Sequence, residues 1–274
     1  GVTLRTQTRV QSLSVGADSE PVAIHTPQGE VRARVVGGAM GKFSNLDRQW
    51  RPEQLPQATQ APTYVGIKYH LRTAFPRDLI ALHNFEGGYC GISAIEPDPT
   101  APQISRVCCC YLVSQMTLQA AGGIAALEKN VLAQNPYLAS ILTHAEPCWS
   151  QPLSIAQVYF SPRQPGKGPL FFVGDAAGLI PPLCGNGMSM AFRSAHLLFP
   201  LWQQHLQGNL SLAQTQRQYQ QRWQKNFGVR MATGRALQQT FGHLWPVNTL
   251  LYGLRPFKGL TRQLIQRTHG QAFS

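Results

Sequence analysis

The order of apolar and polar residues along the chain predicts a β-rich first half. The first forty residues alternate in the manner of strands, with a turn over residues 27–30. Residues 64–111 contain short alternating segments separated by Pro, Gly and Asn, which predict an antiparallel meander of about four strands. Residues 44–62 are polar and include three prolines, so we expect a surface connection there.

The second half of the chain is predominantly helical in its pattern. Residues 114–145 place apolar side chains at helical spacing, and Asn135-Pro136 divides the stretch into two helices. An extended segment over residues 151–160 follows, and from Gly187 the spacing is helical almost to the end. We expect breaks in these last helices at Gly208-Asn209, Gly228, Pro246 and Pro256.

Composition agrees with a folded protein. Of 274 residues, 43% are hydrophobic and 13% are charged, which is typical of globular chains and not of disordered ones. The predicted elements come in the order strands, helices, one more strand and a helical tail. This order predicts an α/β or mixed two-domain protein.

Charge is distributed unevenly along the chain. Lys and Arg number 24 against 12 Asp and Glu, and residues 176–274 contain 10 basic residues and no acidic one. This distribution excludes an evenly basic, histone-like protein. It indicates that the last third of the chain faces something anionic, such as phosphates, nucleic acid or a lipid surface.

The sequence gives no sign of targeting or of a metal centre. The opening residues lack the features of a signal peptide, and no stretch approaches the roughly 20 apolar residues of a membrane span. We therefore expect a cytoplasmic protein. The six cysteines include the run Cys108–Cys110, which fits neither a disulfide framework nor a CxxC metal pair, so we expect reduced, mostly buried thiols and no metal.

The segment from Pro169 to Leu198 carries the strongest chemical signal. An apolar strand ends in Gly174, which permits a sharp turn, and Asp175 then lies at the carboxyl end of the strand, where parallel sheets bind ligands. Gly185 and Gly187 precede an amphipathic helix, whose free N–H groups and dipole would stabilise an anion. Any one of these features alone usually marks a tight connection, whereas the whole arrangement is far more specific.

This arrangement resembles the second flavin-binding motif of the FAD-dependent oxidoreductases related to para-hydroxybenzoate hydroxylase and geranylgeranyl reductase. The resemblance implies FAD as cofactor and NAD(P)H as the reductant. It implies that Asp175 binds the ribityl hydroxyls of FAD after the turn at Gly174, and that Pro182 lines the edge of the flavin ring. The backbone expected to lie against the ring belongs to Gly185, Asn186, Gly187 and Met188.

An earlier segment, Ala39–Ser44, also resembles a motif of this family. Ala39–Ser44 stands where the family has Ala-Asp-Gly, but Met40 replaces the acid, so we assign no carboxylate role there. We reject a P-loop in the same segment, because its spacing is one residue short and Phe43 follows Lys42. Cys184 adjoins the flavin motif, and either simple packing or a redox role is open for it.

The resemblance covers roughly residues 2–198 and implies a strand, a GxGxxG turn and a helix that bind the ADP half of FAD. No GxGxxG occurs in this chain. We therefore expect that the chain lacks this first βαβ unit, and that residues 1–274 alone bind FAD weakly or not at all.

The expected fold is α/β: an incomplete Rossmann-like FAD-binding domain with an inserted antiparallel-sheet substrate domain and a C-terminal helical tail. We assign residues 1–60 to the partial FAD-binding domain and 61–165 to the substrate domain. Residues 166–205 carry the second flavin motif, and 206–274 form a basic helical region.

The resemblance implies a small-molecule substrate that meets the flavin at the antiparallel sheet. Polar side chains on otherwise apolar strands are candidates for its pocket, although each is also compatible with a solvated strand face. These candidates are Lys68, His70, His83, Asn84, Tyr89 and Cys90. We expect an FAD-dependent monooxygenase of a small aromatic or lipophilic substrate; the alternatives are a reductase of isoprenoid or polyene double bonds and a truncated, non-catalytic binding protein.

Three interpretations remain open for the basic C-terminal region. No known nucleic-acid-binding module is present, so we expect no nucleic acid partner. Peripheral contact with a membrane would suit residues 244–265, which combine apolar and basic side chains. A helical cap packed on the flavin domain, with its charges in water, is the third interpretation.

Overall fold

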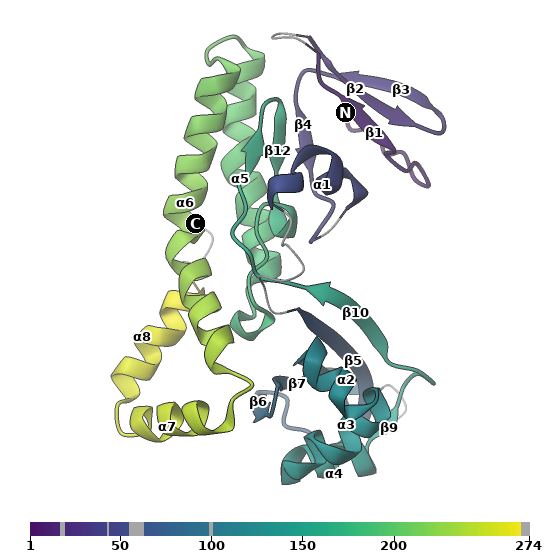
Figure 1. Cartoon of the computed structure of the whole chain (residues 1–274), viewed down its shortest axis with the longest axis vertical. Coiled ribbons are helices and arrows are strands. Elements are labelled where there is room, and N and C mark those ends of the chain that lie inside the picture. Colours follow the sequence, from purple (N-terminus) through teal and green to yellow (C-terminus); the bar gives the residue numbers. More distant parts are fainter. Residues whose placement is uncertain (17–19, 43, 55–62, 99–100, 270–274) are drawn as a thin grey trace. The chain divides into compact units, whose positions relative to one another are not determined.

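The computed structural model describes residues 1–16, 20–42, 44–54, 63–98 and 101–269 (Figure 1). The described residues form two compact units. The first unit combines the described parts of residues 1–59 and 267–274 with residues 160–234, and the second combines those of 60–159 with residues 235–266. The mixed α/β class expected from the sequence is confirmed, and the assignment of functional domains stays a prediction.

The first unit begins with a small antiparallel sheet of order β1-β2-β3. Its strands are β1 (Ser12–Ser14), β2 (Val22–Thr26) and β3 (Gly29–Ala33). The tight turn between β2 and β3 is confirmed, and Gly29 adopts φ +118° in it. The strand pattern over the first ten residues is misleading, because nearly all of these side chains are exposed on both sides and gain nothing from alternation.

A second sheet of the first unit has the order β11-β12-β4. It consists of β4 (Val36–Gly38), β11 (Gly166–Lys167) and β12 (Leu170–Phe172). β12 runs parallel to β4, with Phe172 opposite Gly38. A Cβ on Gly38 would lie 2.7 Å from the Phe172 ring, so this close approach requires glycine.

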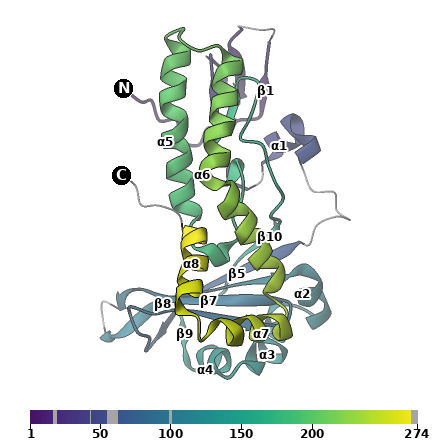
Figure 2. The same cartoon turned by 90° about the vertical axis from the view of Figure 1, so that its left-hand side faces the viewer.

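Helices α5 (Gly187–Leu206) and α6 (Leu212–Thr240) lie side by side in both views (Figures 1 and 2). The break predicted at Gly208-Asn209 is confirmed, whereas the break predicted at Gly228 is wrong, because α6 runs through it. Glycine in a helix costs only about 1 kcal/mol relative to alanine. Burial of Phe227 and Met231 on either side of it outweighs this cost.

The connection predicted on the surface over residues 44–62 is wrong in its first part. Asn45–Trp50 forms helix α1, followed by a 3-10 turn over Pro52–Gln54, and residues 55–62 lie outside the described residues. Asp47 and Arg51 are each 1% exposed. Polar residues are buried here because they neutralise one another, which a hydrophobicity pattern cannot reveal.

The second unit is built on an antiparallel sheet of order β10-β5-β8-β7-β6, with β9 paired to β5. Its strands are β5 (Tyr64–Thr73), β6 (Ile80–Phe85), β7 (Gly88–Asp98), β8 (Ala101–Ser114), β9 (Glu146–Pro147) and β10 (Leu153–Val158). The predicted meander holds for β6, β7 and β8, but β5 pairs with β8 and not with β6. This position suits β5, whose Val65, Gly66 and Ile67 are all buried.

One face of this sheet is covered by three helices (Figure 2). They are α2 (Gln115–Ala121), α3 (Ile124–Asn130) and α4 (Pro136–His144). The division at Asn135-Pro136 is confirmed: the Asn135 side chain accepts hydrogen bonds from the N–H groups of Tyr137 and Leu138. The prediction of two helices is wrong, because Gly122 and Gly123, both with positive φ, separate α2 from α3. All six cysteines are free, and Cys109 of the Cys108–Cys110 run lies in the core between sheet and helices.

The chain ends in helices α7 (Leu244–Leu254) and α8 (Lys258–His269). Pro256 separates them as predicted. The break predicted at Pro246 is wrong, because Pro246 lies in the first turn of α7, where a backbone N–H has no partner within the helix anyway.

Candidate functional site

The turn after β12 is fixed by contacts with α5. Gly174 adopts φ +59°, and a Cβ on it would lie 3.1 Å from the Cβ of Ala191. The Gly174 N–H donates a 2.9 Å hydrogen bond to Oγ of Ser194, whose side chain is buried. Glycine is therefore required here for both its dihedral angle and its size, and the turn holds Asp175 at the end of the strand.

The Asp175 carboxylate lies beside the first turn of α5. A Cβ on Gly187 would be 3.9 Å from Asp175 Oδ1. Asn186 is the N-cap residue of α5, but no side chain caps the helix. The first N–H groups of a helix have no partner within it, and they form the positive end of its dipole. This helix start can therefore bind an anionic or hydrogen-bond-accepting ligand.

The other site residues predicted from the sequence surround the same helix start. Pro182 and Gly185 are exposed, and Met188 is 81% exposed. Gly185 adopts φ +66°, and a Cβ on it would have no atom within 4 Å. The structure thus brings together Gly174, Asp175, Pro182, Gly185, Asn186, Gly187 and Met188.

Two cations act on Asp175. Burial raises the pKa of Asp175 above its ordinary value, and the positive charges of Arg163 and Lys42 partly offset this rise. Burial also lowers the pKa of Lys42. Among the described residues, the Asp175 carboxylate has no hydrogen-bond or ion-pair partner. A half-buried carboxylate in this state is able to accept hydrogen bonds from a ligand.

A buried ion-pair network beside this site was missed in the sequence. Asp47 Oδ1 accepts hydrogen bonds from both Nε and Nη2 of Arg51, and Asp47 Oδ2 lies 3.4 Å from Arg163 Nη1. The Arg51 guanidinium lies 3.6 Å above the centre of the Phe172 ring on β12. The i, i+4 spacing of Asp47 and Arg51 was the available signal. Lys42, whose positive charge acts on Asp175, belongs to the segment Ala39–Ser44 in which Met40 replaces the expected acid. Phe43 of that segment lies outside the described residues.

Cys184 is buried against α6. A Cβ on Gly234 would lie 3.0 Å from its Sγ. Burial raises the pKa of the Cys184 thiol to about 11, although the positive charge of Arg230 lowers it. A thiol in this state is a poor nucleophile, so the geometry favours packing over a redox role.

The six candidates for the substrate pocket lie on opposite faces of the second unit's sheet. His83 and Cys90 are opposite one another in the β6–β7 register and face α2–α4. His83 stacks on Tyr137 of α4, with ring centres 5.8 Å apart, and Cys90 Sγ lies 3.6 Å from Cys109 Sγ. These two residues therefore do not share a pocket with the other four.

The other four candidates belong to the opposite face. Tyr89 is 3% exposed and packs edge-on against Phe241, and Asn84 bonds to the backbone of Gly242 and His243. Asn84 and Tyr89 thus hold the connection between α6 and α7.

Lys68 and His70 lie on this face opposite Cys110 and Cys108 in the register, and both side chains are partly exposed. The His70 ring lies 4.4 Å from that of Trp149. Its Nε2 atom is buried without a hydrogen-bond partner in the described part of the chain, and burial lowers its pKa.

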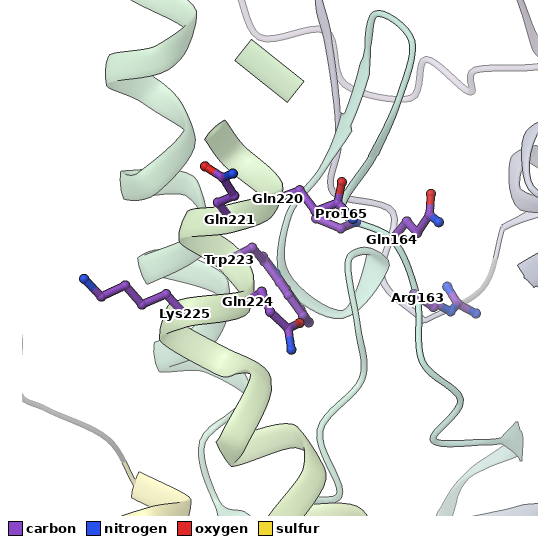
Figure 3. A pocket seen from close by; sticks show the side chains of 8 residues that line it. All are labelled: Arg163, Gln164, Pro165, Gln220, Gln221, Trp223, Gln224 and Lys225. Carbon is purple, nitrogen blue, oxygen red and sulfur yellow. The ribbon is translucent and has the colours of Figure 1, made fainter. Parts of the chain in front are cut away.

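A separate hollow of about 560 Å³ lies between α6 and the loop that contains Arg163 (Figure 3). Its lining consists of Arg163, Gln164, Pro165, Gln220, Gln221, Trp223, Gln224 and Lys225. The side chains of Gln221 and Lys225 point away from the loop (Figure 3). None of the site residues predicted from the sequence lines this hollow, so we keep Asp175 and the start of α5 as the candidate site. Within the described ranges, no three His, Cys, Asp or Glu side chains are placed to hold a metal ion.

Comparison with known proteins places the fold. No protein-family model and no curated protein matches the sequence. The flavin-dependent brominase Bmp2 matches with a TM-score of 0.69 and 15% identity, over 96% of this chain and 66% of that one. PqsL of Pseudomonas aeruginosa, assigned as an FAD-dependent monooxygenase, matches with a TM-score of 0.61 and 18% identity, over 89% and 66%.

A third solved structure is the geranylgeranyl bacteriochlorophyll reductase-like protein of Thermoplasma acidophilum. It matches with a TM-score of 0.64 and 15% identity, over 86% of this chain and 58% of that one. The chain spans less than two thirds of the length of each of these proteins. The three TM-scores show that the chain shares its fold with flavin-dependent oxidoreductases.

Proposed function

We propose that this chain carries the flavin-contacting part of an FAD-dependent oxidoreductase. The observation that carries the proposal is the Asp175 carboxylate, half-buried and without a partner among the described residues, beside a helix start that no side chain caps. A buried polar group without a partner is costly. Hydroxyl groups of a ligand would remove that cost, and the ribityl chain of FAD supplies them.

The residues around Asp175 fit this cofactor. Gly185 and Gly187 have no side chain, so a planar ring can approach the backbone there, and Pro182 and Met188 are exposed beside them. The N–H groups at the start of α5 would stabilise negative charge on the pyrimidine side of the ring. When bound, flavin supplies two-electron transfer between a nicotinamide and a substrate.

For the reaction, we propose a monooxygenase that uses NAD(P)H and acts on a small aromatic or lipophilic substrate. The fold shared with PqsL supports it. Reduction of isoprenoid or polyene double bonds is the second candidate, supported by the fold shared with the geranylgeranyl reductase-like protein. A truncated, non-catalytic binding protein is the remaining alternative. Lys68 and His70, on the sheet face opposite α2–α4, are the polar side chains we propose for the substrate.

The experiment is a titration of the chain with riboflavin and with FAD, followed by flavin fluorescence. Because Asp175 and α5 would contact only the part that the two ligands share, we expect their dissociation constants to agree within about tenfold. Asp175→Asn should weaken both by roughly 10- to 100-fold, the value of a hydrogen bond to a charged group. Glu53→Gln, a change in an exposed carboxylate of the same unit, is the control and should have no effect.

Two results would overturn the proposal. One is equal flavin affinity for the wild-type chain and Asp175→Asn. The other is an equal loss of flavin affinity in Glu53→Gln, which would show that the effect does not depend on Asp175.

A further inference from the structure

The last two helices expose large apolar side chains next to basic ones. We call this set the α7–α8 surface. Its apolar members are Trp245 (79% exposed), Leu251 (55%), Tyr252 (72%), Phe257 (60%) and Leu260 (52%), and its basic members are Arg255, Lys258 and Arg262. Isolated exposed apolar residues are normal, whereas these five lie within sixteen consecutive residues, 245–260, of α7, the turn after it and the start of α8.

Helix α7 is anchored by its other side. Val247 is 1% exposed, and the connection that leads into α7 is bonded to Asn84 of β6 through Gly242 and His243. Trp245 and Tyr252 are at positions i and i+7, so they lie on the same side of the helix. The anchoring therefore holds two aromatic rings outward.

Helix α8 is joined to α7 by defined contacts. The Phe257 N–H donates to the Leu254 carbonyl at 2.9 Å, and the Thr261 hydroxyl reaches the same carbonyl at 3.4 Å. The two helices meet in a sharp turn, drawn in yellow in Figures 1 and 2. Leu260 lies in the first turn of α8, and Phe257 directly precedes that helix.

The charge of this surface has one sign. Arg255, Lys258 and Arg262 are exposed, and residues 176–274 contain no Asp or Glu. No carboxylate of α7 or α8 can therefore neutralise these cations. A partner of matching chemistry must be both anionic and able to accept Trp, Tyr, Phe and Leu side chains.

We propose that the α7–α8 surface docks on an anionic lipid bilayer. Trp and Tyr favour the level of the lipid headgroups, and amphipathic helices with basic residues lie in the plane of that interface. The attraction of each basic residue to anionic lipid adds to the burial of the apolar side chains. None of the helices within the described ranges has the length and hydrophobicity of a membrane span, which is consistent with contact from one side.

The test is co-sedimentation of the full chain with two kinds of vesicles. One kind contains phosphatidylcholine alone, and the other contains in addition roughly one third phosphatidylglycerol. We expect binding to the anionic vesicles, weakened by high salt. The triple variant Arg255→Gln, Lys258→Gln and Arg262→Gln should lower the partition coefficient by about 100-fold. The variant Trp245→Ser and Tyr252→Ser should lower it as well, because it removes apolar contact.

A matched control carries the same change of charge on α6. Arg217, Arg222 and Lys225 are also exposed, and their replacement by Gln should leave most of the binding intact. Quenching of tryptophan fluorescence by brominated lipid should fall in Trp245→Phe, a variant that leaves the charges unchanged. Circular dichroism of each variant verifies that it is folded.

Three outcomes would overturn the proposal. The first is equal binding to both kinds of vesicles. The second is an equal loss in the α6 control, which would indicate a general effect of charge. The third is binding of a duplex or single-stranded oligonucleotide through these basic residues without binding of anionic vesicles, which would assign the surface to nucleic acid.

Discussion

The carboxylate of Asp175 lies beside the backbone of Gly187, where an added Cβ would be 3.9 Å from Asp175 Oδ1. The turn after a buried parallel strand and the first turn of a long helix thus form one structure. Its rigidity comes from Gly174, which bonds to Ser194 of α5 and has no room for a side chain. The negative side chain and the positive helix end are therefore held together before any ligand binds.

Asp175→Asn should stabilise the ligand-free chain at neutral pH. Burial outweighs the attraction of Arg163 and Lys42 and raises the pKa of Asp175, so ionisation is less favourable in the folded state than in the unfolded one. We expect a gain of roughly 0.5–1 kcal/mol in the free energy of unfolding. This value is smaller than the cost of a fully buried group without a hydrogen bond, because Asp175 is only half-buried. Urea unfolding monitored by circular dichroism measures it.

The pH dependence of this gain has a definite sign. A raised folded-state pKa makes the wild-type chain lose stability as pH rises from the ordinary aspartate pKa through the raised one. The gain of Asp175→Asn should therefore be present at pH 7 and should disappear near about pH 3, where both states are protonated. A gain that is larger at low pH would contradict the raised pKa.

Asp47→Asn should be strongly destabilising. The change leaves Arg51 and Arg163 as buried cations without their carboxylate, their side chains being 1% and 5% exposed. Breaking a buried pair in this way costs about 3–5 kcal/mol. Glu53→Gln removes an exposed pair with Lys167 and is the matched control, with an expected cost of at most about 1 kcal/mol. Equal changes in the urea midpoint would refute the distinction.

Glu128 should be important for the stability of the second unit. Its Oε1 accepts hydrogen bonds from the hydroxyls of Tyr69 at 2.7 Å and Tyr111 at 2.6 Å. Burial, and then these bonds, raises the pKa of both tyrosines. Tyr111→Phe should lower the free energy of unfolding by about 1–3 kcal/mol. Tyr137→Phe, at a site that is 69% exposed, should change it by less than about 0.5 kcal/mol. A comparable loss in both variants would contradict the role of Glu128.

Cys110 should be the first thiol to react with Ellman's reagent. It is exposed, whereas Cys108 and Cys148 are partly buried and Cys90, Cys109 and Cys184 are buried. Its pKa is nevertheless raised to about 11 by desolvation, so at pH 8 the reaction should be at least about tenfold slower than that of free cysteine, and it should accelerate as pH rises. Cys110→Ser should abolish this first phase. An unchanged first phase in that variant would show that another thiol reacts.

Much of the candidate site could be predicted from the sequence because its signals are local. A short apolar run, a Gly-Asp pair and glycines before an amphipathic helix are each encoded within a few residues, and the structure places Asp175 beside the start of α5. Alternation also fixes that His83 and Asn84, or Tyr89 and Cys90, point to opposite faces of a strand. This signal separates neighbouring candidates on one strand, whereas the register of the sheet is needed to place Lys68 and His70.

Local pattern by itself predicted the main strands of the second sheet, a helical stretch after them that divides at Asn135-Pro136, and a turn at Gly174 and Asp175 that is followed by a helix. Only the tertiary structure decided that β5 lies beside β8, that α6 continues through Gly228, and that Asp47, Arg51 and Arg163 meet in the core. The physical reason is that residue spacing reflects which side of an element is apolar, whereas strand order and buried ion pairs depend on which distant surfaces bury one another.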